Sequence, residues 1–339
     1  MIVLLRADAS PLQGTGHVMR CLTVGEELTR RGHEVVLMTN DSGVAWLERV
    51  ITDSQLHIYR TATNSLDARK IRDLAPDWVV VDSYEIGAQD ISALRSWCHV
   101  LAIVDGDDRG IDADLYLDHN LGSEDGPWGQ STRERLLAGS EFALIRHAVL
   151  REKRQQPWIP RGLTPHIVAF MGGSDPTGAI VPVAGAFAMM EGDLTASVIA
   201  DPRWRADVEE KLRGIPGIEL LEPTAELPRL LRRADIAVSA AGTSAWELCS
   251  LGIPSLLISV VENQRESLTR LETRGLVLGL DLSQGGRESA EARIVERVTR
   301  LLSSESEREK LSLDCTGTYD GRGKERVVSA MELLGASSN

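Results

Sequence analysis

His17 follows a glycine-containing turn that joins an apolar segment to a helical one. Ile2 to Leu5 is apolar and Cys21 to Arg31 has helical spacing, which predicts a buried strand, a tight turn and a helix. Open α/β sheets bind ligands at the carboxyl ends of their strands, and Gly14 and Gly16 let the backbone approach a ligand closely. The N-terminal end of a helix disfavours a protonated imidazole. We therefore expect His17 to be a neutral ring that accepts a proton, as a general base does.

Two further predicted strands of the first half end in acidic or hydroxyl side chains. Asp82 and Tyr84 follow Trp78 to Val81, and Asp105 follows Val100 to Val104. The carboxyl ends of parallel strands meet at one edge of a sheet, so we expect these residues to flank His17. Catalysis or sugar contact and a purely structural role remain open for them. No ligand spacing requires a metal, and we expect none.

Arg6 and Asp8 lie at the start of the same turn. Their opposite charges allow a local ion pair that shapes the loop, and Arg6 is equally well placed to contact a ligand. Both roles stay open for Arg6.

Three turns in the second half combine small residues, hydroxyls or amides with the start of a predicted helix. Backbone N–H groups there can hold an anion such as a diphosphate, and a carboxylate one turn into a helix can accept hydrogen bonds from a ribose diol. Simple helix capping is the alternative at each turn. The candidate ligand-binding residues are Gly173, Ser174, Gly242, Thr243, Ser244, Glu247, Asn263 and Gln264, together with Leu221 at the end of another predicted strand.

Strands and helices alternate along both halves, which predicts an α/β protein of two Rossmann-like domains facing across a cleft. We expect domains at 1–150 and 166–339, joined by a charged, proline-containing linker at 151–165. Residues 122–135 are polar and rich in glycine, which predicts a loop. The strands expected are 2–5, 35–38, around 58, 78–81, 100–104, 115–117, 166–171, 196–200, 218–221, 236–239 and 255–260, and 141–146 is expected to be a strand or turn.

The composition is that of a water-soluble globular protein. A net charge of −13 over 339 residues argues against nonspecific nucleic-acid binding, which needs a basic face. The four cysteines have no paired spacing, so neither a disulfide framework nor a zinc site is expected. The first strand begins directly after Met1, and no apolar run is long enough to span a bilayer. We therefore expect a cytoplasmic protein without a cofactor and without membrane insertion.

Several of these motifs together resemble the nucleotide-sugar hydrolase of pseudaminic acid biosynthesis and its spore-coat polysaccharide relatives. The resemblance extends over both halves. The second half of the chain is also similar to the UDP-binding domain of the peptidoglycan N-acetylglucosaminyltransferase. The matching segments are Arg6-x-Asp8-x-Ser10-(x)3-Gly14-x-Gly16-His17-x-x-Arg20-Cys21-Leu22, Val81-Asp82-x-Tyr84, Ala143-Leu144-Ile145-Arg146, Met171-Gly172-Gly173-x-Asp175, Ser239-Ala240-Ala241-Gly242-Thr243-Ser244-x-x-Glu247, Leu251-Gly252-x-Pro254 and Asn263-Gln264.

The resemblance implies the GT-B architecture of two Rossmann-like domains and a UDP-sugar substrate. It implies that His17 is the catalytic base, with Asp82 and Tyr84 beside it. It further implies that Glu247 binds the ribose, that 242–244 forms the diphosphate loop, and that Asn263 and Gln264 face the sugar. Gly14, Gly16, Arg6 and Asp105 complete the sugar or acceptor side.

The hydrolases usually carry a histidine where this chain has Ser83. The favoured expectation is metal-independent, inverting cleavage of the C1–O bond of a UDP-sugar by water, with His17 as general base. The replacement at Ser83 gives weight to the alternative, in which the same base activates a small acceptor, an alcohol or a nucleobase nitrogen, for glycosyl transfer. A non-catalytic sugar-nucleotide sensor is a third, less favoured, class.

Overall fold

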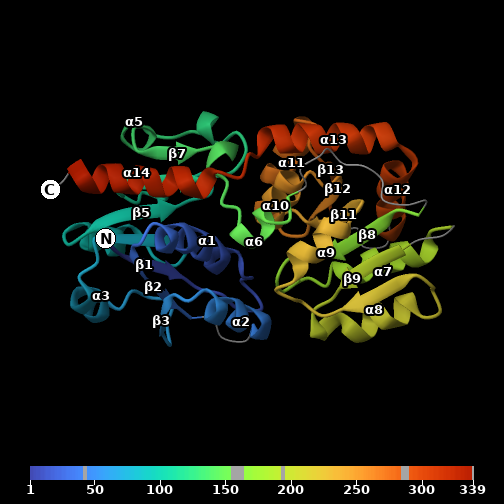
Figure 1. Cartoon of the computed structure of the whole chain (residues 1–339), viewed down its shortest axis with the longest axis horizontal. Helices are drawn as coiled ribbons and strands as arrows, with labels where there is room; N and C mark the ends of the chain where they lie inside the picture. The colour runs from blue at the N-terminus through green and yellow to red at the C-terminus, as the bar shows by residue number, and fades with distance from the viewer. Residues whose placement is uncertain (41–43, 154–163, 192–194, 284–289, 338–339) are drawn as a thin grey trace. The chain divides into compact units, whose positions relative to one another are not determined.

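The chain forms two units, each built around its own parallel sheet (Figure 1). One unit comprises Met1–His147 together with Gly321–Asn339, and the other comprises Ala148–Asp320. The computed structural model describes residues 1–40, 44–153, 164–191, 195–283 and 290–337. Two parallel α/β sheets confirm the predicted fold class of two Rossmann-like domains.

The sheet of the first unit has seven parallel strands in the order β3-β2-β1-β4-β5-β6-β7. The chain starts in the middle of the sheet, extends to one edge through β3, and then crosses to β4 on the other side of β1. The strands are β1 Ile2–Ala7, β2 Glu34–Thr39, β3 His57–Arg60, β4 Trp78–Asp82, β5 His99–Ile103, β6 Leu115–Asp118 and β7 Leu136–Ala138, and the helices are α1 Gly16–Arg30, α2 Ala45–Asp53, α3 Ala68–Leu74, α4 Ala88–Arg95, α5 Gln130–Arg133 and α14 Gly323–Ser337, with single 3-10 turns at Ser123–Asp125 and Ser140–Phe142.

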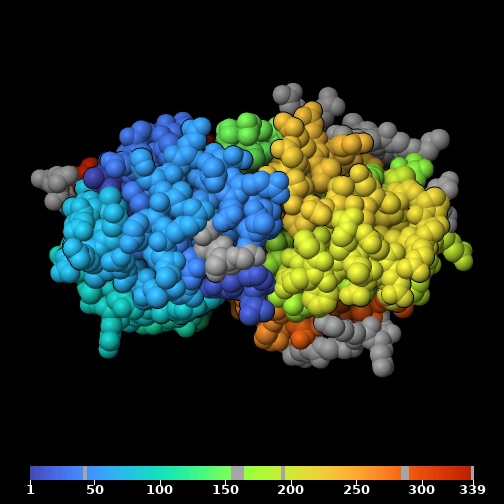
Figure 2. Space-filling view, turned by 90° about the horizontal axis from the view of Figure 1, so that it is seen from below, coloured from blue at the N-terminus to red at the C-terminus, as the bar shows by residue number. Residues whose placement is uncertain are grey.

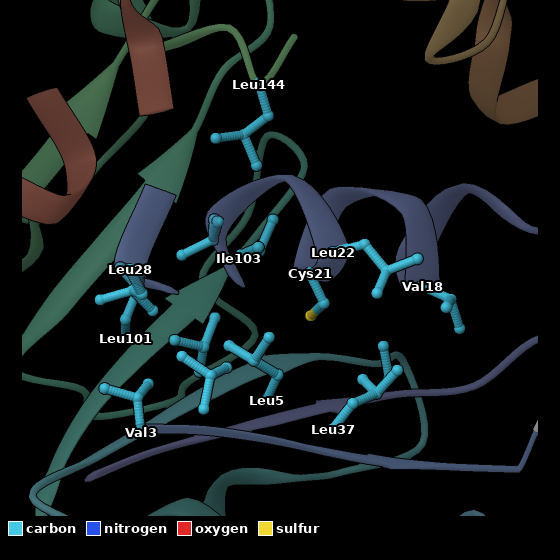
Figure 3. Close-up of a cluster of buried hydrophobic side chains, with 14 of the residues drawn as sticks. Val3, Leu5, Val18, Cys21, Leu22, Leu28, Leu37, Leu101, Ile103 and Leu144 are labelled. Carbon is cyan, nitrogen blue, oxygen red and sulfur yellow. The ribbon is translucent and has the colours of Figure 1, made fainter. Parts of the chain in front are cut away.

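Successive residues of the central strands enter different cores, because side chains alternate between the two faces of a sheet. Val3 and Leu5 of β1 join one apolar cluster, whereas Leu4 joins the other. The first cluster also contains Val18 and Cys21 of α1, which lie between that helix and the sheet in Figure 3. Burial on both faces explains why these strands have continuous apolar sequences. It also fixes the start of α1, and with it His17, at the carboxyl end of β1.

The sheet of the second unit has six parallel strands in the order β10-β9-β8-β11-β12-β13. Figure 2 shows the outer elements around the edge strands, α2 and β3 of the first unit in blue and α8 and β10 of the second in yellow. The strands are β8 His166–Phe170, β9 Thr195–Ile199, β10 Ile218–Leu221, β11 Ile236–Ala240, β12 Ser255–Ser259 and β13 Leu278–Asp281, and the helices are α7 Ile180–Met189, α8 Arg205–Leu212, α9 Leu227–Arg233, α10 Ser244–Leu251, α11 Arg265–Thr273, α12 Ala290–Ser303 and α13 Glu305–Thr318, with 3-10 turns at Pro202–Trp204 and Glu262–Gln264 and the short helix α6 His147–Leu150 at the boundary between the units.

The C-terminal helix α14 belongs to the first unit, which corrects the predicted domain boundaries. Val327, Val328 and Met331 of this helix are fully buried in the same cluster as residues of β1 and α1. Glu332 accepts hydrogen bonds from Arg31 and bonds with His33 at the end of α1. The apolar face of α14 therefore completes the first unit, so a division of the chain into consecutive domains was wrong. Most of the predicted linker, 154–163, lies outside the described residues.

Gly323 allows α14 to begin in direct contact with the chain at residues 142–143. A Cβ at Gly323 would lie 2.2 Å from the carbonyl oxygen of Ala143, and no flexible side chain is there to move. We expect Gly323→Ala to lower the free energy of unfolding by roughly 1–3 kcal/mol, because overpacking against backbone costs about that much. The measurement is a urea unfolding curve of the whole chain.

Gly335 in the same helix provides the matched control. A Cβ there would lie 3.4 Å from Trp78 Nε1 and 3.6 Å from Met1 Sδ, which are ordinary contacts. Gly335→Ala should be neutral or stabilising, since alanine favours a helix over glycine by up to about 1 kcal/mol. Equal effects at the two positions would contradict this account of how α14 docks.

Candidate functional site

His17 and Asp82 come together because β1 and β4 are neighbours in the sheet. Ala7 at the end of β1 is in register with Asp82 at the end of β4, and His17 is the second residue of α1. His17 Nδ1 lies 2.6 Å from Asp82 Oδ1. Arg20 Nη2 also lies 2.9 Å from His17 Nδ1, but it donates to Asp82 Oδ1 at 2.7 Å. Because the carboxylate can only accept, we assign the ring proton to Nδ1, which leaves the lone pair on Nε2. The described residues give Nε2 no hydrogen-bond partner, so this nitrogen can accept a proton from a substrate.

Arg20, one turn further along α1, fixes the carboxylate of Asp82. Its Nε lies 2.7 Å from Asp82 Oδ2 and its Nη2 lies 2.7 Å from Oδ1, a two-point contact. Its Nη1 donates to Asp105 Oδ1 at 3.0 Å. Burial alone would raise the pKa of Asp82, but the charge of Arg20 and the hydrogen bonds from Arg20 and His17 hold that pKa below its ordinary value. Asp82 is therefore an ionised, oriented acceptor for the His17 ring.

Tyr84 and Asp105 form the other side of the cluster. The Tyr84 hydroxyl donates to Asp105 Oδ2 at 2.6 Å, and Asn120 Nδ2 donates to Oδ1 of the same carboxylate at 3.1 Å. Burial and the neighbouring Asp105 charge raise the pKa of Tyr84 well above its ordinary value, so its hydroxyl remains a donor. The Tyr84 ring meets the His17 ring edge to face at 5.0 Å and is 50% exposed. Tyr84 thus presents an aromatic surface next to the proposed base.

His119 is a fully buried member of the cluster. Its Nδ1 accepts the Leu144 N–H at 3.3 Å, and its Nε2 lies 3.5 Å from Arg20 Nη1. Burial and the charge of Arg20 lower its pKa to about 3. This histidine therefore stays neutral in the folded protein throughout the physiological pH range.

The lowered pKa of His119 predicts a pH dependence of stability. In the unfolded chain His119 binds a proton near pH 6.5, whereas in the folded chain it does so only near pH 3. The contribution of His119 to the free energy of unfolding is therefore highest above pH 6.5 and falls as the pH decreases from 6.5 toward 3. Between pH 7 and pH 5 we expect His119 to account for a loss of about 2 kcal/mol, and His119→Gln to remove that part of the loss. Urea unfolding curves at the two pH values measure it. An unchanged pH dependence in the variant would contradict the buried, neutral state.

The Arg6 side chain is enclosed by the protein, and this decides between the two roles considered for Arg6, a local ion pair and contact with a ligand. Its side chain is fully buried, and its guanidinium bonds Asp8 Oδ1 at 2.5 Å and the carbonyl oxygens of Met38, Thr63 and Ser65. Contact with a ligand was therefore the wrong alternative, and the local ion pair was the right one. Arg6 links the end of β1 to β2 and to the chain that follows β3.

Gly14 closes the tip of the turn before His17. It pairs with Ser10 through hydrogen bonds in both directions and has φ of 87°, a conformation that favours glycine. Gly16 is the first residue of α1. Both glycines therefore shape the entry to the helix that carries His17, and their predicted contact with a sugar or acceptor stays a prediction.

In the second unit, the loop after β8 is held by its own side chains. Asp175 accepts the N–H groups of Ala179 and Ile180 at the start of α7, as the capping alternative required. Arg203 and the Trp204 indole donate to the carbonyl oxygens of Ser174 and Asp175 respectively. Ser174 is buried and Gly173 is half-buried. Capping thus explains Asp175, while the predicted anion contact of Gly173 and Ser174 stays a prediction.

The turn after β11 contains the hydroxyls of Thr243 and Ser244, and the side chain of Gln264 lies close to its Gly242. Thr243 precedes α10 without a side-chain capping bond, and no hydrogen bond of the Ser244 hydroxyl is found among the described residues. Gln264 Oε1 accepts the Val260 N–H at 3.0 Å, and a Cβ on Gly242 would lie 3.6 Å from Gln264 Nε2. The two predicted groups of residues therefore meet, and together they present N–H and O–H donors suited to an anion.

The other predicted residues of the second unit lie near the ends of their strands. Glu247 is buried in the first turn of α10, Asn263 is exposed in the turn after β12, and Leu221 is the last residue of β10. The ligand contacts expected for these three side chains stay predictions.

Sequence reasoning missed Arg20, His119, Asn120 and Arg109 as parts of the cluster around His17. One signal was available for Arg20, because a residue three positions after His17 lies on the same face of the helix. His119 and Asn120 directly follow β6, at the same sheet edge as Asp82 and Asp105.

Within the described ranges, no group of three or more His, Cys, Asp or Glu side chains is arranged to hold a metal ion. None of the helices in the part of the chain that the structure describes is both long enough and apolar enough to cross a membrane.

Comparison with known proteins gives relatives at low identity and many similar structures. No protein-family model matches the sequence. The spore coat polysaccharide biosynthesis protein SpsG of Bacillus subtilis is 23% identical over 340 residues, which cover 97% of each chain. The spinosyn rhamnosyltransferase SpnG, solved with thymidine diphosphate, superposes with a TM-score of 0.69 at 16% identity over 97% of this chain and 99% of that one.

A UDP-GlcNAc 2-epimerase from Neisseria meningitidis, bound to UDP-GlcNAc, superposes with a TM-score of 0.67 at 15% identity over 98% of this chain and 99% of that one. The fold is shared. At these identities the comparisons support the GT-B fold class and leave the reaction to be argued from the site.

Proposed function

We propose that this protein is a glycosyltransferase that moves a sugar from a UDP donor to a small acceptor, with His17 as the general base. The observation that carries the proposal is the 2.6 Å contact between His17 Nδ1 and the buried carboxylate of Asp82. This contact places the ring proton on Nδ1 and directs the basic lone pair to Nε2. A histidine so oriented by a carboxylate is the arrangement by which hydroxyl nucleophiles are activated in other enzymes.

In the proposed reaction the acceptor attacks the anomeric carbon on the face opposite the diphosphate. Its proton passes to His17 Nε2, a new bond forms to C1, and the C1–O bond breaks with its electron pair leaving on UDP. The N–H and O–H donors around Gly242, Ser244 and Gln264 stabilise the departing diphosphate in this scheme. The proposed configuration at C1 is therefore inverted, and no metal takes part.

The relatives support transfer over hydrolysis as the main proposal. SpnG and other structures with this fold are named as glycosyltransferases, and none of the three relatives described above is named as a hydrolase. Ser83 also favours transfer over hydrolysis, since the hydrolases that the sequence resembles usually carry histidine at this position.

Hydrolysis is the second candidate because the first motif, from Arg6 to Leu22, resembles that of the pseudaminic acid hydrolase. Water would then take the place of the acceptor, and His17 would keep the same role. The sequence favoured this outcome, and the relatives favour the other.

The deciding experiment measures UDP release from a panel of UDP-sugars, with and without alcohols, phenols and nucleobases as acceptors. Release that requires an acceptor supports transfer, and release in buffer alone indicates hydrolysis. A sugar product that still carries UDP, or binding without any UDP release, would contradict both candidates.

A further inference from the structure

A second positively charged side chain lies next to the Tyr84 ring. The Arg109 Cζ is 5.5 Å from the centre of that ring, and the same ring is 5.0 Å from the His17 ring. The separation between the Arg109 Cζ and the centre of the His17 ring therefore cannot exceed 5.5 Å plus 5.0 Å. The Tyr84 ring therefore contacts both the proposed base and a cationic side chain.

The backbone at Arg109 is held in a conformation that few residues adopt. Its φ is +53°, which costs a non-glycine residue on the order of 1 kcal/mol. The turn is fixed by Asp107, which accepts the Arg109 N–H at 2.9 Å, and by Asp108, which accepts the Gly110 N–H at 3.0 Å. Asp108 also accepts the Thr132 hydroxyl at 2.7 Å. The loop therefore presents Arg109 at a defined position.

Unlike its neighbours, Arg109 has no anionic partner in the part of the chain that the structure describes. Asp105, the carboxylate that accepts the Tyr84 hydroxyl, is already bonded by Arg20, Tyr84 and Asn120. Asp108 accepts the Gly110 N–H with one oxygen and the Thr132 hydroxyl with the other, and Asp107 accepts the Arg109 N–H with one of its oxygens. The only contact recorded for the Arg109 guanidinium there is the face of the Tyr84 ring. Its five donors are available to a ligand.

We propose that Arg109 binds a carboxylate of the molecule that reacts at His17. The inference rests on the proposed function and narrows its substrate class, because a planar guanidinium next to an aromatic ring matches the two-point geometry of a carboxylate. The carboxylate belongs either to the donor sugar, as in a uronic acid, or to the acceptor. Arg109 is a binding residue in this scheme and takes no part in proton transfer.

The test compares substrates that differ only in the carboxylate. For the donor, UDP release is measured with UDP-glucuronate and UDP-glucose. For the acceptor, it is measured with 4-hydroxybenzoate and 4-hydroxybenzamide in the presence of the better donor. Each pair is assayed with the wild type, Arg109→Ala, Arg109→Lys and the control Arg69→Ala, an exposed arginine on α3.

We expect Arg109→Ala to lower kcat/KM roughly 10–100-fold for the carboxylate member of one pair, mainly through KM, because a charge-assisted hydrogen bond is worth about that much. The neutral member and the Arg69→Ala control should change less than about two-fold, and Arg109→Lys should keep part of the preference. Which pair responds identifies the molecule that carries the carboxylate. Equal losses on charged and neutral members, or weaker binding of UDP itself, would overturn the proposal.

A binding measurement separates this inference from the proposed reaction. The arginine side-chain NMR signals of wild-type protein are titrated with glucuronate, 4-hydroxybenzoate and their neutral counterparts, and the Arg109 signal is assigned by its loss in Arg109→Ala. A shift of that signal with a carboxylate compound alone supports the site even if no UDP is released, in which case only the proposed reaction fails. No shift with any carboxylate compound, together with no preference in turnover, overturns the site.

Discussion

Replacing His17 with asparagine should lower the rate of UDP release roughly 10²–10⁴-fold, the range in which general-base assistance contributes to catalysis. Asparagine retains a polar side chain of similar size but cannot accept the proton of the nucleophile. UDP affinity, measured by calorimetry, should change less than about two-fold, because the proposed diphosphate donors lie in the other unit. The loss should appear in kcat more than in KM, since the base acts in the transition state.

His57 supplies the matched control for that experiment. It is an exposed histidine on β3 of the same unit, so His57→Asn removes an imidazole without touching the cluster around His17. UDP release by this variant should match the wild type. Turnover of His17→Asn within ten-fold of the wild type would remove His17 from the mechanism.

The central strands and long helices of the fold were predictable from the sequence because their patterns are local. Burial on both faces makes β1, β4 and β11 continuous apolar segments, and the predicted strand 218–221 agrees with β10 at both ends. The predicted Rossmann-like class followed from this alternation.

The elements that escaped prediction depend on tertiary contacts. β7, Leu136–Ala138, has three residues and lies between the predicted loop at 122–135 and the segment 141–146, which was expected to be a strand or turn. Its strand conformation comes from pairing with β6. β13, Leu278–Asp281, is short, contains Gly279 and pairs with β12 at the edge of its sheet. The docking of α14 on the first unit depends on Gly323, whose reason for being glycine is visible only beside residues 142–143. Sequence spacing contains none of this information.

The candidate site was predictable to the same extent as the strand ends. Asp82, Tyr84 and Asp105 could be placed at one sheet edge because they come at the ends of predicted parallel strands. His17 could be placed there because its turn and helix follow the first predicted strand. The partners that set their chemistry could not, since a buried arginine such as Arg20 is recognised only when its carboxylates are seen around it. Arg6 shows the reverse error, because an arginine next to a predicted ligand-binding turn is fully buried and bonds carbonyl oxygens of two other segments, β2 and residues 63–65.

The arrangement around Asp82 makes a second strong prediction. Asp82→Asn preserves the shape of the side chain but removes the charge that keeps the ring proton on His17 Nδ1. We expect UDP release to fall roughly 10²–10⁴-fold, since a neutral amide at this place allows the wrong tautomer of the histidine. The variant also leaves Arg20 with Asp105 as its remaining carboxylate partner, so a lower free energy of unfolding is expected as well.

The double variant His17→Asn/Asp82→Asn separates the catalytic effect from the loss of stability. If Asp82 acts on catalysis only through His17, the double variant releases UDP no more slowly than His17→Asn alone, because residues that act as one unit are not additive. Activities are compared at a temperature where circular dichroism shows each variant folded, and UDP affinity reports the integrity of the second unit. Losses that multiply in the double variant would mean that Asp82 contributes independently of the histidine, and the 2.6 Å contact would then not be the feature that makes His17 a base.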